Sequence, residues 1–165
     1  GMKSTTERFL EMQSHYQKEP TKEQAEKISI LKDLSKMVFL RSNKMSISDL
    51  KPKEIWIYSR NDEKSIVNGQ YDTNFVWLAE EVLKGSLPDV LSTYLHELCH
   101  KKGADESSEF SYALTDVQAV VIDLLLNPND NEKQILEGMK SKWKILNSDK
   151  VQKSSIWDRF RKKKS

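Results

Sequence analysis

The chain is organised around residues 86–103, which read SLPDVLSTYLHELCHKKG. Within this segment, His96, Glu97 and His100 form an H-E-x-x-H motif. On a helix, the two histidines lie one turn apart on the same face, so both imidazoles can reach one metal ion. Glu97 then lies where it can accept a proton from a water that the metal activates. The motif predicts a zinc-hydrolase type of site, and the alternative is a chance match on an amphipathic helix.

Local signals predict that residues 86–100 are helical. Ser86 is suited to the N-cap, Pro88 to the first turn, and Asp89 follows the serine by three residues. Residues 101–103 supply the cations and the glycine that are typical of a helix end. Apolar residues recur at helical spacing and predict a side that faces the core: Leu91, Tyr94, Leu95 and Leu98. The histidines fall on an adjacent face, as expected for the wall of a cleft.

A catalytic zinc site usually has three protein ligands, so the two histidines need a partner. Asp105, Glu106 and Glu109 follow the glycine turn and are the nearest candidates. Capping of the next helix would also explain acidic residues at these positions. His15, the third histidine of the sequence, has no motif around it and is interpreted as a surface residue.

Residues 96–105, together with Ser107, Phe110 and residues 113–115, resemble a family of small bacterial zincins. These are minigluzincin-like metallopeptidase domains that are often joined to a GHKL-type ATPase domain. The family shows H-E-L-x-H, a short glycine-containing turn, an aspartate five residues before a phenylalanine, and then Leu-Thr. The resemblance spans residues 55–116 and implies zinc with Asp105 as third ligand. Other small zincins place this ligand four residues before the phenylalanine, which here is Glu106.

Composition sets broad limits on the class of protein. The 165 residues are 37% hydrophobic and 32% charged, with a net charge of +2, which favours a soluble and mainly helical domain. No run of about 18 apolar residues is present, and the N-terminus lacks a secretory pattern, so we expect a cytoplasmic protein without a membrane span. The single cysteine, Cys99, excludes an internal disulfide. It is interpreted as a core residue rather than a ligand.

The predicted fold is α+β and zincin-like, with one domain over residues 1–147. A helical pair over residues 4–43, interrupted at Pro20, is expected to cover the domain; the alternative is partner binding through these helices. A metal-site core follows over residues 54–126. It begins with a small antiparallel sheet of three strands, whose edge can hold an extended peptide: residues 54–59, 65–71 with an Asn-Gly turn, and 75–78.

The C-terminal part is predicted to contain two helices and a tail. The first helix runs from residue 107 to about 127, and Asp116 or Asp123 within it is a candidate to orient a ligand histidine. The second helix spans residues 130–146. The tail, residues 148–165, is basic, but the small net charge disfavours nucleic acid as a partner.

Together these features predict a zinc-dependent metallopeptidase. His96, His100 and either Asp105 or Glu106 would hold zinc, and Glu97 would act as general base on a peptide or protein substrate. Tyr94 and Tyr112 are candidates for oxyanion donors. The alternative is a catalytically inactive zincin-like domain that serves in binding or regulation.

Overall fold

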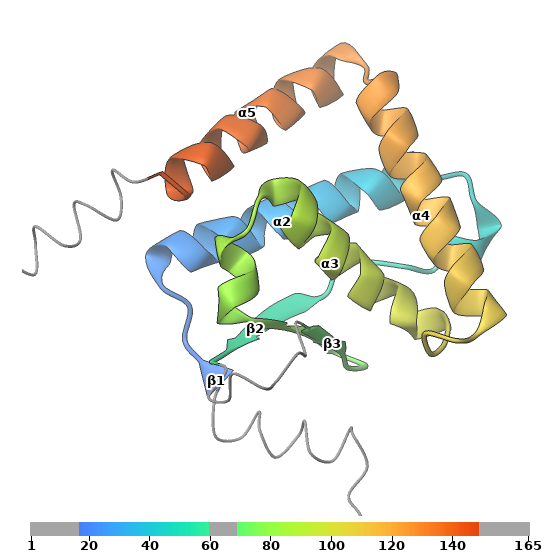
Figure 1. The fold of residues 1–165 in the computed structure, drawn as a ribbon. Helices are drawn as coiled ribbons and strands as arrows, with labels where there is room; N and C mark the ends of the chain where they lie inside the picture. Colours follow the sequence, from blue (N-terminus) through green and yellow to red (C-terminus); the bar gives the residue numbers. More distant parts are fainter. Residues whose placement is uncertain (1–16, 60–68, 149–165) are drawn as a thin grey trace, which may run out of the picture. The chain divides into compact units, whose positions relative to one another are not determined.

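The computed structural model describes residues 17–59 and 69–148. The chain divides into two compact units after Asn127. The first unit has the α+β architecture that the sequence predicts, with helices and a small sheet (Figure 1). The single domain expected over residues 1–147 stays a prediction. The helix predicted before Pro20 reaches the described residues only at 17–19, and it is wrong there because Gln17–Lys18 is a strand. The rest of that helix, the turn at residues 60–64, residues 65–68 of the second predicted strand, His15 and the C-terminal tail beyond Ser148 lie outside the described residues.

The sheet has four strands in the order β1-β2-β4-β3: β1 (Gln17–Lys18), β2 (Glu54–Tyr58), β3 (Gly69–Tyr71) and β4 (Phe75–Ala79). The prediction of an antiparallel sheet is wrong for its central pair, because β2 and β4 run parallel. β3 pairs antiparallel with β4, and β1 pairs antiparallel with β2. The consecutive strands β2 and β3 do not pair, because β4 lies between them. β1 was not predicted.

The Asn-Gly turn predicted within residues 65–71 is not found at Gly69, and Asn68 lies outside the described residues. Gly69 begins β3 and the chain reverses at residues 72–74 instead, where the Asp72 N–H donates to the Phe75 carbonyl at 2.8 Å. The Asn74 N–H donates to the Asp72 carboxylate at 3.2 Å. An aspartate that bonds backbone two residues ahead stabilises such a turn without the Asn-Gly pair.

Alternation along β2 and β4 separates two kinds of side chain. Ile55, Ile57, Val76 and Leu78 form one buried set of registered pairs. The aromatic rings of Trp56, Phe75 and Trp77 contact one another on the opposite face. The aliphatic face is the one that meets the helices, because a Cβ on Gly69 would touch both Leu78 and the helical residue Glu97.

Two helices cover the sheet (Figure 1). Helix α2 (Lys22–Arg41) begins with a capping box between Thr21 and Gln24, as expected for a chain that resumes after Pro20. Helix α3 (Leu87–Cys99) follows the 3-10 turn η2 (Glu80–Lys84). The predicted bounds of α3 are thus confirmed to within a residue.

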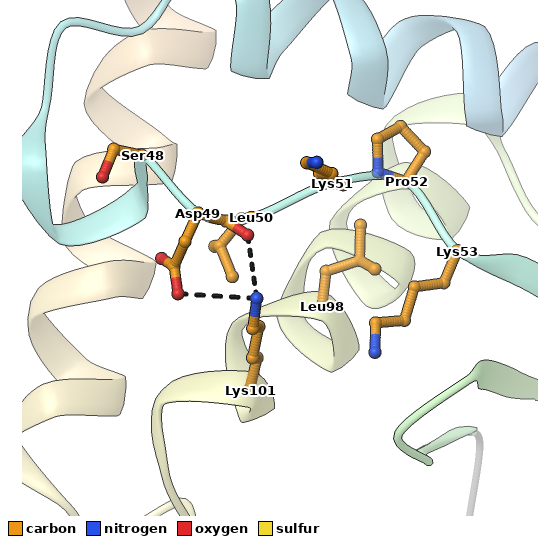
Figure 2. Close-up of a pocket in the computed structure, with 8 residues that line it drawn as sticks. All are labelled: Ser48, Asp49, Leu50, Lys51, Pro52, Lys53, Leu98 and Lys101. Carbon is orange, nitrogen blue, oxygen red and sulfur yellow. Dashed lines mark hydrogen bonds and ion pairs between the residues drawn. The ribbon is translucent and has the colours of Figure 1, made fainter.

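The segment between α2 and β2 is tied to α3. It contains the 3-10 turn η1 (Met45–Ile47) and the loop 48–53, which lies beside the end of α3 (Figure 2). The Tyr94 hydroxyl, fully buried on α3, donates to the Lys53 carbonyl at 2.6 Å and accepts from the Lys53 N–H at 2.9 Å. These two hydrogen bonds fix the start of β2 relative to α3.

Helix α4 (Ser108–Leu126) packs against α2, α3 and η1. Arg41 at the end of α2 bonds the Asp123 carboxylate at 3.0 Å and the Asn127 carbonyl at 2.9 Å. The guanidinium therefore closes the C-terminal end of α4, where a cation complements the helix dipole.

The second unit contains helix α5 (Asp130–Leu146), whose bounds match the prediction. Asn129 and Glu132 form its capping box, as an Asn-x-x-Glu sequence favours. In the parts of the chain that are described, no helix has the length and apolar character needed to cross a membrane.

Candidate metal centre

The local sequence holds the H-E-x-x-H motif at the C-terminal end of α3. The Ser86 hydroxyl caps the helix by accepting from the Asp89 N–H at 3.4 Å. Tyr94, Leu95 and Leu98 are buried as predicted, which anchors one side of the helix in the core. The prediction is wrong for Leu91, which is only half-buried, whereas Val90 is buried. His96 and His100 keep 39% and 17% of their side-chain surface exposed, so both rings border solvent.

A sharp turn after α3 brings an acidic residue back to the histidines. The helix ends at Cys99 and continues as the 3-10 turn η3 (His100–Lys102) up to Gly103. Gly103 has φ +152°, and a Cβ there would lie 2.2 Å from the Ser107 hydroxyl. Only glycine fits this backbone conformation and this close approach. The turn therefore depends on Gly103, and Asp105 lies two residues after this glycine.

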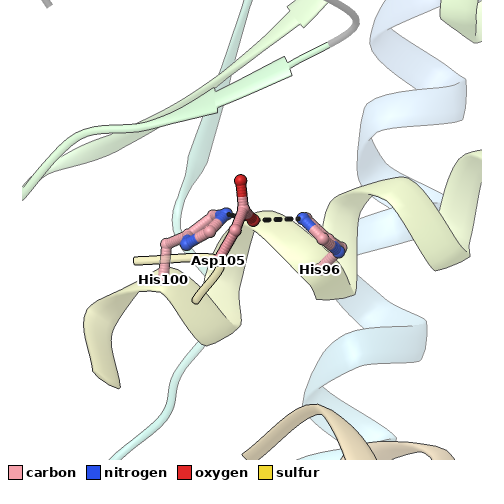
Figure 3. Close-up of side chains that lie close together, drawn as sticks. All are labelled: His96, His100 and Asp105. Carbon is pink, nitrogen blue, oxygen red and sulfur yellow. Dashed lines mark ion pairs between the residues drawn. The ribbon is translucent and has the colours of Figure 1, made fainter. Parts of the chain in front are cut away.

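His96, His100 and Asp105 form a compact group (Figure 3). One Asp105 carboxylate oxygen lies 3.1 Å from the His100 Nε2 and 3.4 Å from the His96 Nε2. Tetrahedral zinc with bonds of about 2.0–2.1 Å keeps its ligand atoms about 3.3 Å apart. The Asp105 oxygen thus lies at this spacing from both imidazoles, and the donor atoms of all three side chains lie within 4.8 Å of one another, so the group could hold a metal ion.

His100 is oriented by its backbone and aromatic neighbours. Its Nδ1 lies 2.9 Å from the Gly103 carbonyl oxygen, and an N–H donated there leaves Nε2 with its lone pair directed at Asp105. The Phe110 ring stacks on the imidazole at 4.3 Å with an 11° interplanar angle. Phe110 also meets the His96 ring edge-on at 5.0 Å. One buried aromatic residue therefore supports both candidate ligands.

The surroundings favour neutral histidine at position 96. Burial lowers the pKa of His96, and the neighbouring His100 lowers it further, while Asp105 acts in the opposite direction. Neutral imidazole is the form that binds a metal.

Glu97 lies on the inner side of the motif, against the edge strand β3. The side chain is buried, and its Cγ would lie 3.2 Å from a Cβ on Gly69. Burial raises the pKa of the Glu97 carboxyl to about 7; the His100 charge and a backbone hydrogen bond from Tyr71 lower the pKa, and Asp105 raises it. A carboxyl group with this pKa can take up and release a proton near neutral pH.

The other candidate residues are found elsewhere. Glu106 and Glu109 are exposed and do not belong to the group that Asp105 forms with the histidines among the described residues. Asp116 accepts a hydrogen bond from Ser46 and Asp123 pairs with Arg41, so neither carboxylate is the partner of His100 Nδ1. The expected orienting role belongs to the Gly103 carbonyl instead.

Neither candidate oxyanion donor is supported. The Tyr94 hydroxyl is committed to Lys53 in the core, and Tyr112 is 67% exposed on α4. The sequence offered no signal for the contributions of the Gly103 carbonyl or of Gly69 and Tyr71 on β3, because these depend on contacts between distant segments. Phe110 appeared in the motif pattern only as a spacing marker.

No family model matches the chain, and no curated protein and no solved structure matches it.

Proposed function

We propose that the protein is a zinc-dependent metallopeptidase with His96, His100 and Asp105 as metal ligands and Glu97 as general base. The observation that carries the proposal is the convergence of one Asp105 oxygen on both Nε2 atoms, at 3.1 and 3.4 Å, with Glu97 buried beside them. Two imidazoles and one carboxylate leave a fourth position for water and substrate, as in catalytic zinc sites. Zinc bound here would supply Lewis-acid polarisation of the substrate carbonyl.

The roles of the protein's own residues follow from their surroundings. Glu97 takes a proton from the attacking water and passes it to the amine that leaves when the peptide C–N bond breaks. The Tyr71 backbone bonds this carboxylate, and the missing side chain of Gly69 leaves room for the Glu97 methylene groups beside β3. The Gly103 carbonyl keeps the His100 ring in the tautomer that directs Nε2 toward Asp105.

A peptide substrate is favoured by the position of β3. This strand is at the end of the sheet, so one side of its backbone has no strand partner in the described sheet. The same strand contacts Glu97. An extended peptide that pairs with this edge would pass beside the general base.

Metal content and activity test the proposal together. Wild-type protein is expected to carry about one zinc per chain and His96→Ala to lose it, whereas His15→Ala, which removes the remaining histidine of the sequence, is expected to retain it. Cleavage of a mixed peptide library, followed by mass spectrometry, is expected to fall about 10²–10⁴-fold in Glu97→Gln with zinc still bound.

Each contrary result has a distinct meaning. Wild-type protein that takes up no zinc would refute the metal site. Zinc binding without cleavage would favour the inactive zincin-like binding domain. Undiminished cleavage by Glu97→Gln would remove this residue from the mechanism.

A further inference from the structure

A cavity of about 540 Å³ lies between the loop 48–53 and the end of α3 (Figure 2). It is distinct from the group of metal-ligand candidates, none of which lines it. Its walls are formed by eight residues: Ser48, Asp49, Leu50, Lys51, Pro52, Lys53, Leu98 and Lys101.

The walls of this cavity are held by specific contacts. The Lys101 ammonium donates to the Asp49 carbonyl at 3.0 Å and lies 3.5 Å from the Asp49 carboxylate, which Lys102 also contacts. At the other end of the loop, Tyr94 bonds both backbone groups of Lys53. Loop and helix are therefore joined at both ends, so the cavity is formed before any ligand arrives.

The charge of the lining is unbalanced. The lining contains three lysines, Lys51, Lys53 and Lys101, and one carboxylate, Asp49, which pairs with Lys101 and Lys102. The Lys53 ammonium bonds the Tyr71 hydroxyl at 3.0 Å and the carbonyls of residues 72 and 73, and it lies 4.4 Å from the centroid of the Tyr71 ring; none of these partners carries a negative charge. The exposed Lys51 has no side-chain hydrogen bond or ion pair to another described residue. A carboxylate entering the cavity would meet net positive charge.

The cavity adjoins the candidate active site through a short series of contacts. Tyr71 holds the Lys53 ammonium with its hydroxyl and bonds the Glu97 carboxylate with its backbone. Leu98 in the cavity wall directly follows Glu97, and Lys101 directly follows His100. A peptide lying along β3 with its scissile bond near Glu97 would run beside Tyr71, which contacts Lys53 of the cavity lining.

We infer that this cavity is a subsite for a carboxylate of the substrate, with Lys51 as its free cation. The inference rests on the proposed peptidase function and adds a substrate class to it: peptides with an acidic residue, or a free C-terminal carboxylate, next to the cleaved bond. Leu98 and Pro52 supply apolar walls for the methylene groups that carry the carboxylate.

Binding of matched short peptides tests the inference. Full-length Glu97→Gln protein, as purified, is titrated with acetyl-Ala-Ala-Glu-Ala-amide and with its Gln counterpart, and amide shifts are followed by NMR. A third peptide, acetyl-Ala-Ala-Ala-Ala with a free C-terminus, is compared with its amide and distinguishes a terminal carboxylate from a side-chain carboxylate. For either the Glu peptide or the peptide with a free C-terminus, we expect amide shifts at Lys51, Leu98 and Lys101. The matched neutral peptide, with Gln or with a C-terminal amide, should bind more weakly.

Variants then locate the contact. Lys51→Gln should weaken binding of the preferred carboxylate peptide about two- to fivefold, the range expected for an exposed ion pair, and Lys51→Glu should weaken it further. Lys36→Gln on α2, an equally exposed lysine away from the cavity, is the matched control and should leave binding unchanged. The neutral peptide should respond to none of these changes.

Equal binding of the charged and neutral peptides, or unchanged binding in both Lys51 variants, would overturn the subsite. Because the readout is binding and not cleavage, this result leaves the metal and activity tests of the peptidase unaffected. Conversely, carboxylate binding at Lys51 in a protein that neither holds zinc nor cleaves peptides would retain the subsite and refute the peptidase.

Discussion

Replacing each of two neighbouring carboxylates by its amide shows whether Asp105 or Glu106 is the metal ligand. Asp105→Asn and Glu106→Gln remove the same charge from adjacent residues of one exposed turn, so helix capping and long-range electrostatics change almost equally. Only the Asp105 oxygen lies 3.1 and 3.4 Å from the two Nε2 atoms. The structure therefore predicts that zinc affinity falls in Asp105→Asn and is retained in Glu106→Gln.

The size of the effect follows from binding linkage. Loss of a residue that only supports a metal ligand costs about 10–100-fold in affinity, so loss of a direct ligand should cost at least about 100-fold. With free zinc at about 100 times the wild-type Kd, zinc stabilises the wild-type protein by about 2.7 kcal/mol. A variant with 100-fold weaker affinity gains about 0.4 kcal/mol under the same conditions.

Thermal unfolding with and without zinc measures this difference. For a chain of this size, the missing stabilisation of about 2.3 kcal/mol corresponds to a Tm increment smaller by about 5–9 °C in Asp105→Asn. Glu106→Gln should show the full wild-type increment. The reverse pattern, with zinc lost in Glu106→Gln and kept in Asp105→Asn, would refute the assignment and the geometry on which it rests.

Three further outcomes follow from the same contacts. Gly103→Ala should lower the free energy of unfolding, measured by denaturant titration, by about 1–3 kcal/mol and should weaken zinc binding, because φ +152° and the 2.2 Å approach to Ser107 strain any side chain there. The control is Gly138→Ala on α5, where a Cβ meets nothing within 4 Å; this change should be neutral or stabilising in the same titration. Burial raises the pKa of the Tyr94 hydroxyl from 10.0 to about 12, so the contribution of Tyr94 to the unfolding free energy should be constant below about pH 10 and fall by about 2–3 kcal/mol as pH rises to 12. The difference in unfolding free energy between wild type and Tyr94→Phe should therefore change by this amount between about pH 10 and 12, and a difference that does not depend on pH would contradict the prediction. Cys99 is fully buried with its thiol pKa raised to about 12, so mass spectrometry should detect alkylation at pH 8 only after unfolding, and rapid labelling of the native protein would contradict this burial.

The motif residues illustrate how far local sequence information reaches into the site. Local sequence information did not decide between Asp105 and Glu106 as metal ligand, because both residues occupy the same turn and both can cap the next helix. In the folded turn after Gly103, Asp105 lies against the two imidazoles, which Phe110 supports from another side, although the Asp105 side chain stays 73% exposed. Local sequence signals predicted that a helix ends at Gly103. They did not predict that the Gly103 carbonyl orients His100, because this contact exists only in the folded turn.

By itself, the sequence determined the elements whose signals lie within one or two turns of chain. α3 and α5 begin at capping residues and end where those signals predicted, because capping, proline and glycine preferences act over a few residues. Tertiary structure alone decided which strands pair, since β2 joins β4 across the intervening β3 and backbone hydrogen bonding does not distinguish one apolar strand from another. It also decided that β3 lies against Glu97 and that Lys53 and Lys101 line one cavity, because these contacts join segments distant in the chain and arise only when the core has packed.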